Sequence, residues 1–390
     1  MKVLHCPTTV GGNPSGLARA ERRLGVDSVS WALIQNYFAY PVDRVICPAG
    51  GMVARGLGRW RAIGGMLGRF DVVHFNFGDS FAPRRIATCR PGRNRWLAAA
   101  FNRVWGAPLE LADVRWAKRL GAVIAVTFQG DDIRQGDFCR TRYPVHFAHD
   151  VPPDYYTGET DRQKRERIRF FDRHADLIYA VNPDLLNTLP ARARFVAYAS
   201  VDPREWTPVI RTDGAAHEPL VVHAPSNRAV KGTRYLLDAV QKLQAMGIRF
   251  RFQLIENMSH AEARRMYESA DLAVDQLLAG FYGAFAVELM ALGKPVICQL
   301  NQPDLRWLPQ QMRRDIPLIH ADPSSIEPTL RLCLTTRRSE LRELGARGRG
   351  FVEQWHDPLR IAEQLIADYR TALSRRSEAR RNDAAAVLQG

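Results

Sequence analysis

The stretch that decides the fold is residues 220–233, which read LVVHAPSNRAVKGT. Its first five residues are mostly apolar and predict a buried strand, and the polar turn that follows leads into a helix over residues 235–246. Gly247 ends that helix, because glycine adopts the left-handed conformation at low cost. Residues 249–255 predict a second strand. Strand, helix and strand at this spacing are typical of a βαβ unit in a parallel sheet.

The same alternation extends in both directions from this unit. Towards the C-terminus we expect helices at 260–269 and 284–292 and strands at 272–275 and 295–299. In the first half we expect strands at 2–6, 71–77, 122–127 and 177–181, a turn over 11–16, and a helix over 17–24 that stops at Gly25. A polar stretch that contains proline, at 201–217, suits a linker. The sequence therefore predicts two doubly wound α/β domains in series, with ligands at the carboxyl ends of the strands.

Length and composition agree with this organisation. A chain of 390 residues exceeds the size of one ordinary core, and 46% hydrophobic with 25% charged residues is the balance of a soluble globular protein. Six scattered cysteines without a CxxC pair, no apolar leader and no apolar run of membrane-spanning length predict a reduced, cytoplasmic protein. A disordered chain, a collagen-like fibre and a disulfide-stapled domain are excluded. The net charge of +14 suggests a polyanionic partner or surface without naming one.

Several well-known site motifs are absent. The sequence has no GxGxxG with suitable spacing, no GxxxxGK[ST], no GxSxG and no HExxH. Cys139, His146 and His149 could be read as metal ligands, although such spacing also arises by chance. We expect no metal site.

Two segments carry the chemistry. Arg228 and Lys231, three residues apart in a turn, can converge on an anion together with free backbone N–H groups, although two solvated loop cations would look the same. Residues 280–296 read GFYGAFAVELMALGKPV and place Glu288 on an otherwise apolar helix. A buried carboxylate needs a partner. A ribose diol could supply it, or Glu288 could pair with or cap a group in the core.

These two segments resemble the donor half of GT-B glycosyltransferases, specifically the retaining family that uses nucleotide-sugars (family 4). The resemblance runs over about residues 1–370 and includes Gly12 after the first strand and the TFQGDD stretch at 127–132. It implies two Rossmann-like domains that face each other across a cleft, with a C-terminal helix packing back on the first. The implied domains are an acceptor-side domain (1–205), a donor domain (206–358), the crossing helix (359–376) and a flexible tail (377–390).

The resemblance also implies roles for individual residues. Arg228 and Lys231 would bind the diphosphate, Glu288 the ribose, and the amides of Gly283 and Ala284 the phosphate and sugar. The resemblance also places Gly12 and Tyr282 on the donor side. On the acceptor side it places His74, Gln129, Asp131 and Asp132. The implied reaction moves a sugar from a nucleotide diphosphate to an acceptor hydroxyl with retention. It needs no metal and no cofactor, because the nucleotide-sugar is a substrate.

The sequence departs from the family pattern at two positions. Gly280 stands where the family has a glutamate that touches the donor sugar, and Gln129 stands where it has a histidine. Glutamine can hydrogen-bond a sugar but cannot transfer a proton as histidine can. His74 or His223 could act in its place. These departures keep two alternatives open: a non-catalytic nucleotide-sugar-binding protein and a GT-B nucleotide-sugar epimerase.

A basic flank rich in aromatic residues lies between residues 50 and 106. It holds ten arginines and two acidic residues, with Trp60, Trp96, Phe101 and Trp105 interleaved. Arginines opposite apolar side chains are typical of a helix that lies on an anionic membrane, and equally of a helix that packs its apolar face on its own core. Nucleic acid is a weaker option, because no recognised binding module is present. A small-molecule, glycan or lipid-linked acceptor fits the resemblance, and lipid would place the protein at the inner membrane face.

Overall fold

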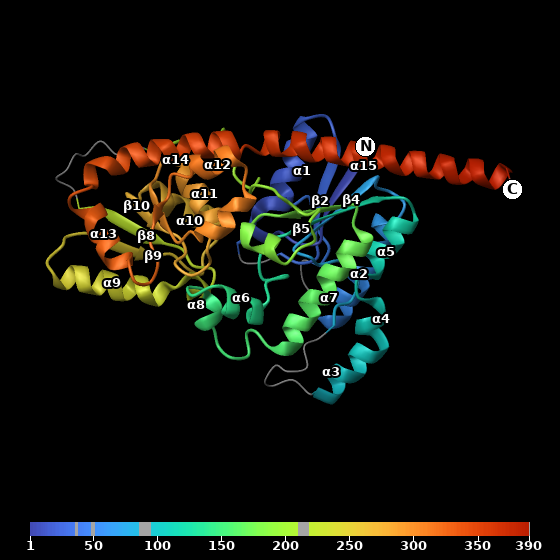
Figure 1. Ribbon diagram of the computed structural model, residues 1–390, viewed down its shortest axis with the longest axis horizontal. Helices are drawn as coiled ribbons and strands as arrows, with labels where there is room; N and C mark the ends of the chain where they lie inside the picture. The colour runs from blue at the N-terminus through green and yellow to red at the C-terminus, as the bar shows by residue number, and fades with distance from the viewer. Residues whose placement is uncertain (36–37, 48–50, 86–94, 210–217, 390) are drawn as a thin grey trace.

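The computed structural model describes residues 1–35, 38–47, 51–85, 95–209 and 218–389, and within them the chain forms two parallel sheets flanked by helices (Figure 1). Cys89, Arg90 and Arg93, and residues 210–217 of the expected linker, lie outside these ranges. The first sheet has the order β3-β2-β1-β4-β5-β6-β7 and the second has the order β12-β11-β10-β8-β9. This confirms the expected pair of α/β domains.

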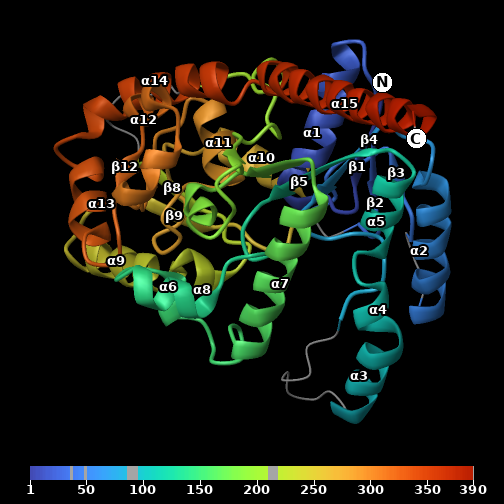
Figure 2. The same ribbon diagram turned by 45° about the vertical axis from the view of Figure 1, so that its right-hand side comes forward.

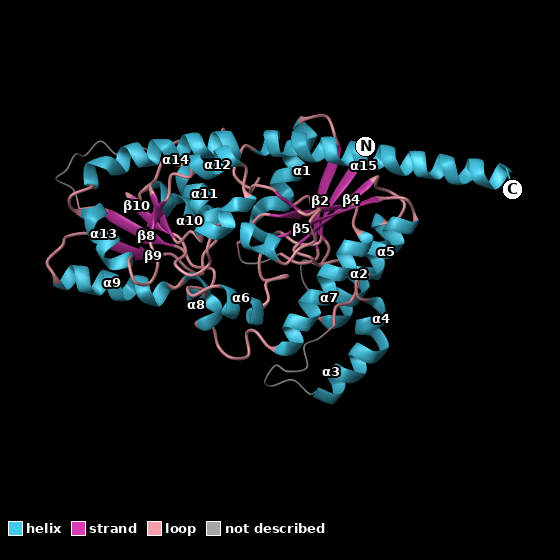
Figure 3. Cartoon of the chain, in the orientation of Figure 1, coloured by secondary structure: helices cyan, strands magenta, loops and turns pink. Residues whose placement is uncertain are grey.

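Strands of the first sheet are separated along the chain by helices that cover its faces (Figure 3). Its strands are β1 (Lys2–Cys6), β2 (Asp27–Ala32), β3 (Arg44–Val45), β4 (Val72–Asn76), β5 (Val123–Phe128), β6 (Leu177–Ala180) and β7 (Arg194–Phe195). Its longer helices are α1 (Asn13–Arg23), α2 (Met52–Met66), α3 (Arg95–Phe101), α5 (Ala112–Arg119), α6 (Gly136–Arg142) and α7 (Gly158–His174). A π-helical turn, η2 (Asn102–Gly106), and the short α4 (Ala107–Leu109) continue α3.

The second domain repeats the arrangement on a smaller sheet. Its strands are β8 (Leu220–His223), β9 (Arg251–Leu254), β10 (Leu272–Val274), β11 (Val296–Cys298) and β12 (Ile319–His320). Its helices are α8 (Arg228–Lys231), α9 (Thr233–Ala245), α10 (His260–Glu268), α11 (Ala284–Ala291), α12 (Gln310–Asp315), α13 (Ile326–Leu334), α14 (Leu341–Trp355) and α15 (Pro358–Gln389). All expected strands and helices are present within two residues at each end except the first helix.

That first helix, α1, begins at Asn13 and not at Leu17. The expected turn over 11–16 was therefore wrong from Asn13 onward. Pro14 lies in its first turn, where a proline is tolerated because the N–H it lacks would have no helical partner. Gly12, at φ +69°, is the residue before the helix. The helix start therefore comes directly after β1, and it brings Gly11 to the edge of the sheet that faces the second domain.

The C-terminal helix crosses back to the first domain, as the fold predicted. In Figures 1 and 2 the red helix α15 runs from the second domain over α1, and α1 and α15 are in contact. Tyr369 of α15 is fully buried, and its hydroxyl lies 2.6 Å from His74 Nδ1. One buried apolar cluster includes Leu17 of α1, Leu289 of α11 and Leu365 of α15 and so joins the two domains. The helix continues through residues 377–389, where the sequence indicated a tail.

The five cysteines in the described ranges are buried and free. Among the described helices, none combines the length and apolar composition that crossing a bilayer requires. The strands of both sheets end towards a cleft between the two domains.

Candidate functional site

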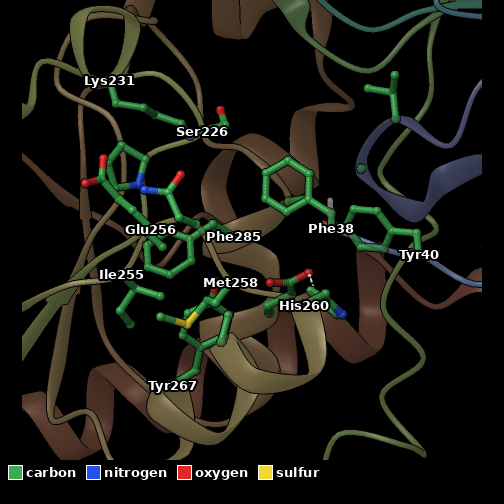
Figure 4. A pocket seen from close by; sticks show the side chains of 18 of the residues that line it. Phe38, Tyr40, Ser226, Lys231, Ile255, Glu256, Met258, His260, Tyr267 and Phe285 are labelled. Carbon is green, nitrogen blue, oxygen red and sulfur yellow. Dashed lines mark hydrogen bonds and ion pairs between the residues drawn. The ribbon is translucent and has the colours of Figure 1, made fainter. Parts of the chain in front are cut away.

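A cavity of about 290 Å³ lies between the two domains and is lined from both (Figure 4). Phe38 and Tyr40 of the first domain lie across it from Lys231 and Glu256 of the second. The lining residues include Gly11, Phe38, Tyr40, Gln129, Ser226, Lys231, Glu256, His260, Ala284 and Glu288. The sequence-predicted residues that the structure brings together here are thus Lys231, Ala284, Glu288 and Gln129.

Lys231 is held in place by a carboxylate that the sequence analysis did not single out. Its Nζ donates to Asp275 Oδ1 at 2.7 Å, and the other oxygen of Asp275 accepts the backbone N–H of Gly283 at 2.7 Å. The side chain of Asp275 is fully buried, directly after β10, and that of Lys231 is 12% exposed. Asp275 therefore ties the ammonium group to the start of α11.

The start of α11 differs from the expected arrangement in one respect. The Gly283 amide is already donated to Asp275, so the first-turn groups left to face an anion are those that follow it, from Ala284 onward. Tyr282 is fully buried, with its hydroxyl 2.9 Å from His356 Nε2, and does not line the cavity. Tyr282, expected on the donor side, therefore lies outside the cavity, and Gly283 contributes through its hydrogen bond to Asp275.

Glu288 projects from α11 into the cavity and is paired. Its Oε1 lies 2.7 Å from Nε2 of His260, the first residue of α10. Burial lowers the pKa of His260, but the hydrogen bond and the charge of Glu288 outweigh it, so the net shift is upward. The His260 ring lies 4.8 Å from that of Tyr40, and its backbone N–H donates to the Phe38 carbonyl at 3.2 Å. The pair thus sits at the junction of the domains.

Arg228 does not line the cavity, but it pairs with Glu256, which does. Its side chain is 58% exposed and pairs with Glu256, with Nε 2.8 Å from Oε1. The hydrogen bond with Glu256 and its charge raise the pKa of Arg228. The same hydrogen bond and the charge of Arg228 lower the pKa of Glu256. Asn227 caps the short helix α8 by accepting the N–H groups of Ala229 and Val230, which fixes the turn that carries both cations.

Gly280 has a backbone conformation that suits glycine. Its φ is +76°, in the left-handed region, and a Cβ there would come within 3.2 Å of Asn301 Cβ. A glutamate at this position would carry both the backbone strain and the contact. The conformation of this loop therefore favours glycine at position 280.

Of the four residues expected on the acceptor side, Gln129 is the one that lines the cavity. It is 8% exposed, its Nε2 lies 3.4 Å from Asn76 Oδ1, and its buried Oε1 has no hydrogen-bond partner in the described part of the chain. An unsatisfied buried oxygen is costly, and a ligand hydroxyl is a partner that would satisfy it. The loop is shaped by Asp132, which accepts the N–H groups of Gln129 and Gly130.

The remaining acceptor-side residues lie away from the cavity. Burial raises the pKa of Asp132 to about 6, and backbone hydrogen bonds lower it in part. Asp131 accepts hydrogen bonds from the hydroxyls of Tyr155 and Tyr156. Both carboxylates are thus occupied in shaping the TFQGDD loop.

The two histidines considered as substitutes for Gln129 are core residues. His74 is fully buried between Tyr369 and Thr127, and burial holds its pKa well below the usual value. His223 is buried with Nδ1 2.7 Å from the Val274 carbonyl, and burial lowers its pKa to about 4. Neither lines the cavity, so neither is positioned to exchange a proton with a ligand there.

The metal alternative finds no support in the described residues, among which no three His, Cys, Asp or Glu side chains are grouped to hold an ion. His146 Nδ1 accepts the N–H of Ala148, and His149 Nε2 lies 2.9 Å from the Tyr143 carbonyl. Gly12 does not line the cavity; its neighbour Gly11 does, and a Cβ on Gly12 would press on the ring of Tyr40.

No protein-family model and no curated protein matches the chain. Solved structures do match over nearly its full length. Sucrose-phosphate synthase from Thermosynechococcus elongatus superposes with a TM-score of 0.56 at 14% identity, over 96% of this chain and 100% of the other. HepE of Anabaena, solved in complex with UDP-glucose, superposes with a TM-score of 0.59 at 12% identity, over 95% and 100%. A glycosyltransferase from Rickettsia africae gives 0.58 at 10% identity, over 95% and 98%.

The chain has the GT-B fold. The cavity lies where that architecture brings its two domains together, and it holds four of the residues expected from the sequence. Glu256 and His260 also line the cavity, and Asp275 holds Lys231. Asp275 could have been noticed as an acidic residue directly after a buried strand, but Glu256 and His260 gave no local signal, because their partners lie 28 residues away along the chain.

Proposed function

We propose that the protein is a nucleotide-sugar-dependent glycosyltransferase of the retaining, family 4 type. The observation that carries the proposal is the inter-domain cavity, which gathers a lysine, a carboxylate on a buried helix, the start of that helix and an unsatisfied glutamine oxygen. A nucleoside diphosphate offers an anion to the lysine and to the start of the helix, and a ribose diol to the carboxylate. A hydroxyl of the sugar or of the acceptor suits the glutamine oxygen.

In the proposed complex the diphosphate lies between Lys231 and the first turn of α11, with Arg228 closing over it from the rim. Both cations are paired with acidic side chains, so the diphosphate competes with Glu256 for Arg228 and shares Lys231 with Asp275. Charge-assisted hydrogen bonds of this kind contribute about 1.5–3 kcal/mol each. The ribose takes the place of His260 on Glu288 or shares the carboxylate with it.

The proposed reaction breaks the bond between the anomeric carbon and the diphosphate oxygen and forms one from that carbon to an acceptor hydroxyl oxygen. The proton of the hydroxyl ends on the released nucleotide. Lys231, Arg228 and the α11 amides stabilise the charge that develops on the leaving diphosphate. Gln129 positions a hydroxyl without exchanging its proton, because an amide does not act as an acid or base near neutral pH.

The proposal includes no cofactor and no metal, and its acceptor is a small molecule, a glycan or a lipid-linked sugar held by the first domain. The second candidate is a nucleotide-sugar-binding protein without turnover, which the conformation of Gly280 favours because its φ of +76° and the Cβ contact with Asn301 at 3.2 Å disfavour a glutamate there. An epimerase is the third outcome, since it would convert the donor alone.

The test is incubation of the protein with UDP-, GDP-, ADP- and dTDP-sugars, with products followed by mass spectrometry and NMR. A transferase releases the nucleoside diphosphate, slowly to water and faster with an acceptor. Binding without release supports the second candidate, and a changed sugar still attached to its nucleotide supports an epimerase. If no donor of the panel is either bound or consumed, the proposal is wrong.

A further inference from the structure

The basic flank between residues 50 and 106 divides into two parts that face different surroundings. In α2, Ile63 and Met66 are 3% and 1% exposed and pack in the core of the first domain. The second group behaves differently. On α3 and η2 the side chains of Trp96, Leu97, Val104 and Trp105 are 87%, 69%, 62% and 53% exposed. Leu57 and Trp60 of α2 are 57% and 41% exposed, so packing on the protein's own core accounts for part of α2 and for little of α3 and η2.

The exposed side chains form one stripe. They come in pairs spaced four residues apart, at 96 and 97, 100 and 101, and 104 and 105. In an α-helix of 3.6 residues per turn, pairs at this spacing drift round the axis, and the wider π turn of η2 offsets that drift. We call Trp96, Leu97, Phe101, Val104 and Trp105 the apolar ridge. Figures 1 and 2 both show α3 at the far end of an arm that projects from the first domain.

The segment that carries the apolar ridge holds positive side chains and no negative ones, and Glu110, which follows it, is paired with Arg85. Residues 95–109 contain no acidic residue, and Arg103 is exposed between Phe101 and Val104. Arg55, Arg61 and Arg84 of the same domain are also exposed, and in the described ranges none of these four arginines forms an ion pair with an acidic side chain. An apolar stripe with exposed tryptophans and unneutralised arginines complements a surface that is apolar inside and anionic at its face.

We propose that the apolar ridge docks the first domain on an anionic lipid surface, with the aromatic side chains in the headgroup region and the arginines on the phosphates. A projecting arm suits insertion into a fluid layer. A partner protein would instead need a matching groove. The docking would place the cavity, and a lipid-linked acceptor of the proposed reaction, at the same membrane. The inference does not depend on turnover, since binding to vesicles is measured without a substrate.

The test is co-sedimentation of the full chain with vesicles of phosphatidylcholine alone and with phosphatidylglycerol added. We expect binding to the anionic vesicles that weakens with salt. The double variant Phe101→Ser/Trp105→Ser should bind at least about tenfold less, because the free energy gained by burying an aromatic side chain corresponds to at least about a tenfold change in affinity. Arg103→Glu should weaken binding to anionic vesicles and reduce its salt dependence. The matched control is Met246→Ser/Leu332→Ser, which removes two exposed apolar side chains of the second domain.

Two results would overturn the proposal. One is equal vesicle binding by the ridge double variant and the control double variant, provided both show the unfolding temperature of the wild type. The other is the absence of vesicle binding together with a dimer that the ridge double variant converts to monomer in light scattering. That second result would assign the ridge to contact between copies of the chain.

Discussion

At the scale of single residues, the site depends on carboxylates that neutralise its cations. Asp275 is fully buried and holds both Lys231 and the Gly283 amide, so the lysine has a fixed position before any ligand arrives. The types and spacing of Arg228, Lys231 and Glu288 could be recognised in the sequence. Their partners could not, because a hydrogen bond between residues 28 or 44 positions apart leaves no local pattern.

Lys231→Ala is expected to weaken nucleoside diphosphate binding about ten- to a hundredfold, in line with one charge-assisted phosphate contact. Isothermal titration calorimetry measures it, with Lys242→Ala, an exposed lysine on α9, as the control. Asp275→Asn should weaken binding in the wild type and change it little in the Lys231→Ala background, since Asp275 acts through the lysine. Additive effects of the two substitutions would contradict the positioning role.

Gln129→Leu tests the acceptor side separately from the donor side. The substitution removes an unsatisfied buried oxygen and one long hydrogen bond, so the free energy of unfolding should change by less than about 1 kcal/mol. Affinity for the nucleoside diphosphate should stay the same, while kcat/KM for the acceptor falls about tenfold or more. Steady-state kinetics with varied acceptor gives the answer, and an unchanged acceptor kcat/KM would remove Gln129 from the site.

At the level of elements, most strands of three or more residues could be predicted, because apolar runs and glycine stops are local signals. The six-residue β2 was not predicted, because its buried positions are Ser28, Ser30 and Ala32, which give no apolar run. The first helix was placed four residues late, since Pro14 reads as a turn residue unless it occupies a first helical turn. The short edge strands β3, β7 and β12 were not predicted: each has two residues, too few to show any periodicity. The loop before α11 could be located but not shaped, because the φ of Gly280 depends on its packing against Asn301.

Gly280→Ala should lower the free energy of unfolding by about 1–2 kcal/mol, from left-handed strain and from the contact with Asn301. Gly247→Ala is the matched control, because its φ is +79° and nothing lies within 4 Å of the added Cβ. Urea unfolding compares them. A loss no larger than that of the control would show that the loop has room for a side chain, and would reopen position 280 to a carboxylate.

At the scale of the whole molecule, the two domains meet through few groups at the cavity, and His260 is central among them. It pairs with Glu288 in its own domain and contacts Phe38 and Tyr40 in the other. The sequence indicated a cleft between domains, because ligands bind where parallel strands end. It gave no sign of how the cleft is bridged, which depends on the relative placement of the domains.

The His260–Glu288 pair makes stability depend on pH. Because the pKa of His260 is raised in the folded state, the pair's contribution is fully present below about pH 6.5 and is lost as pH rises through the raised pKa. The difference in free energy of unfolding between wild type and Glu288→Gln should therefore be larger at about pH 6 than at about pH 9, by about 1 kcal/mol. Urea unfolding at both pH values tests this, and a difference that grows with pH would contradict the assigned pair.

The proposed function requires the inter-domain cavity to bind a nucleoside diphosphate through Lys231 and Glu288. Calorimetric titration of the full chain with UDP, GDP, ADP and dTDP tests it most directly. We expect saturable binding of at least one of them, weakened in Lys231→Ala and in Glu288→Gln and unchanged in Lys242→Ala. Binding of none of the four, or binding that both cavity variants retain in full, would contradict it.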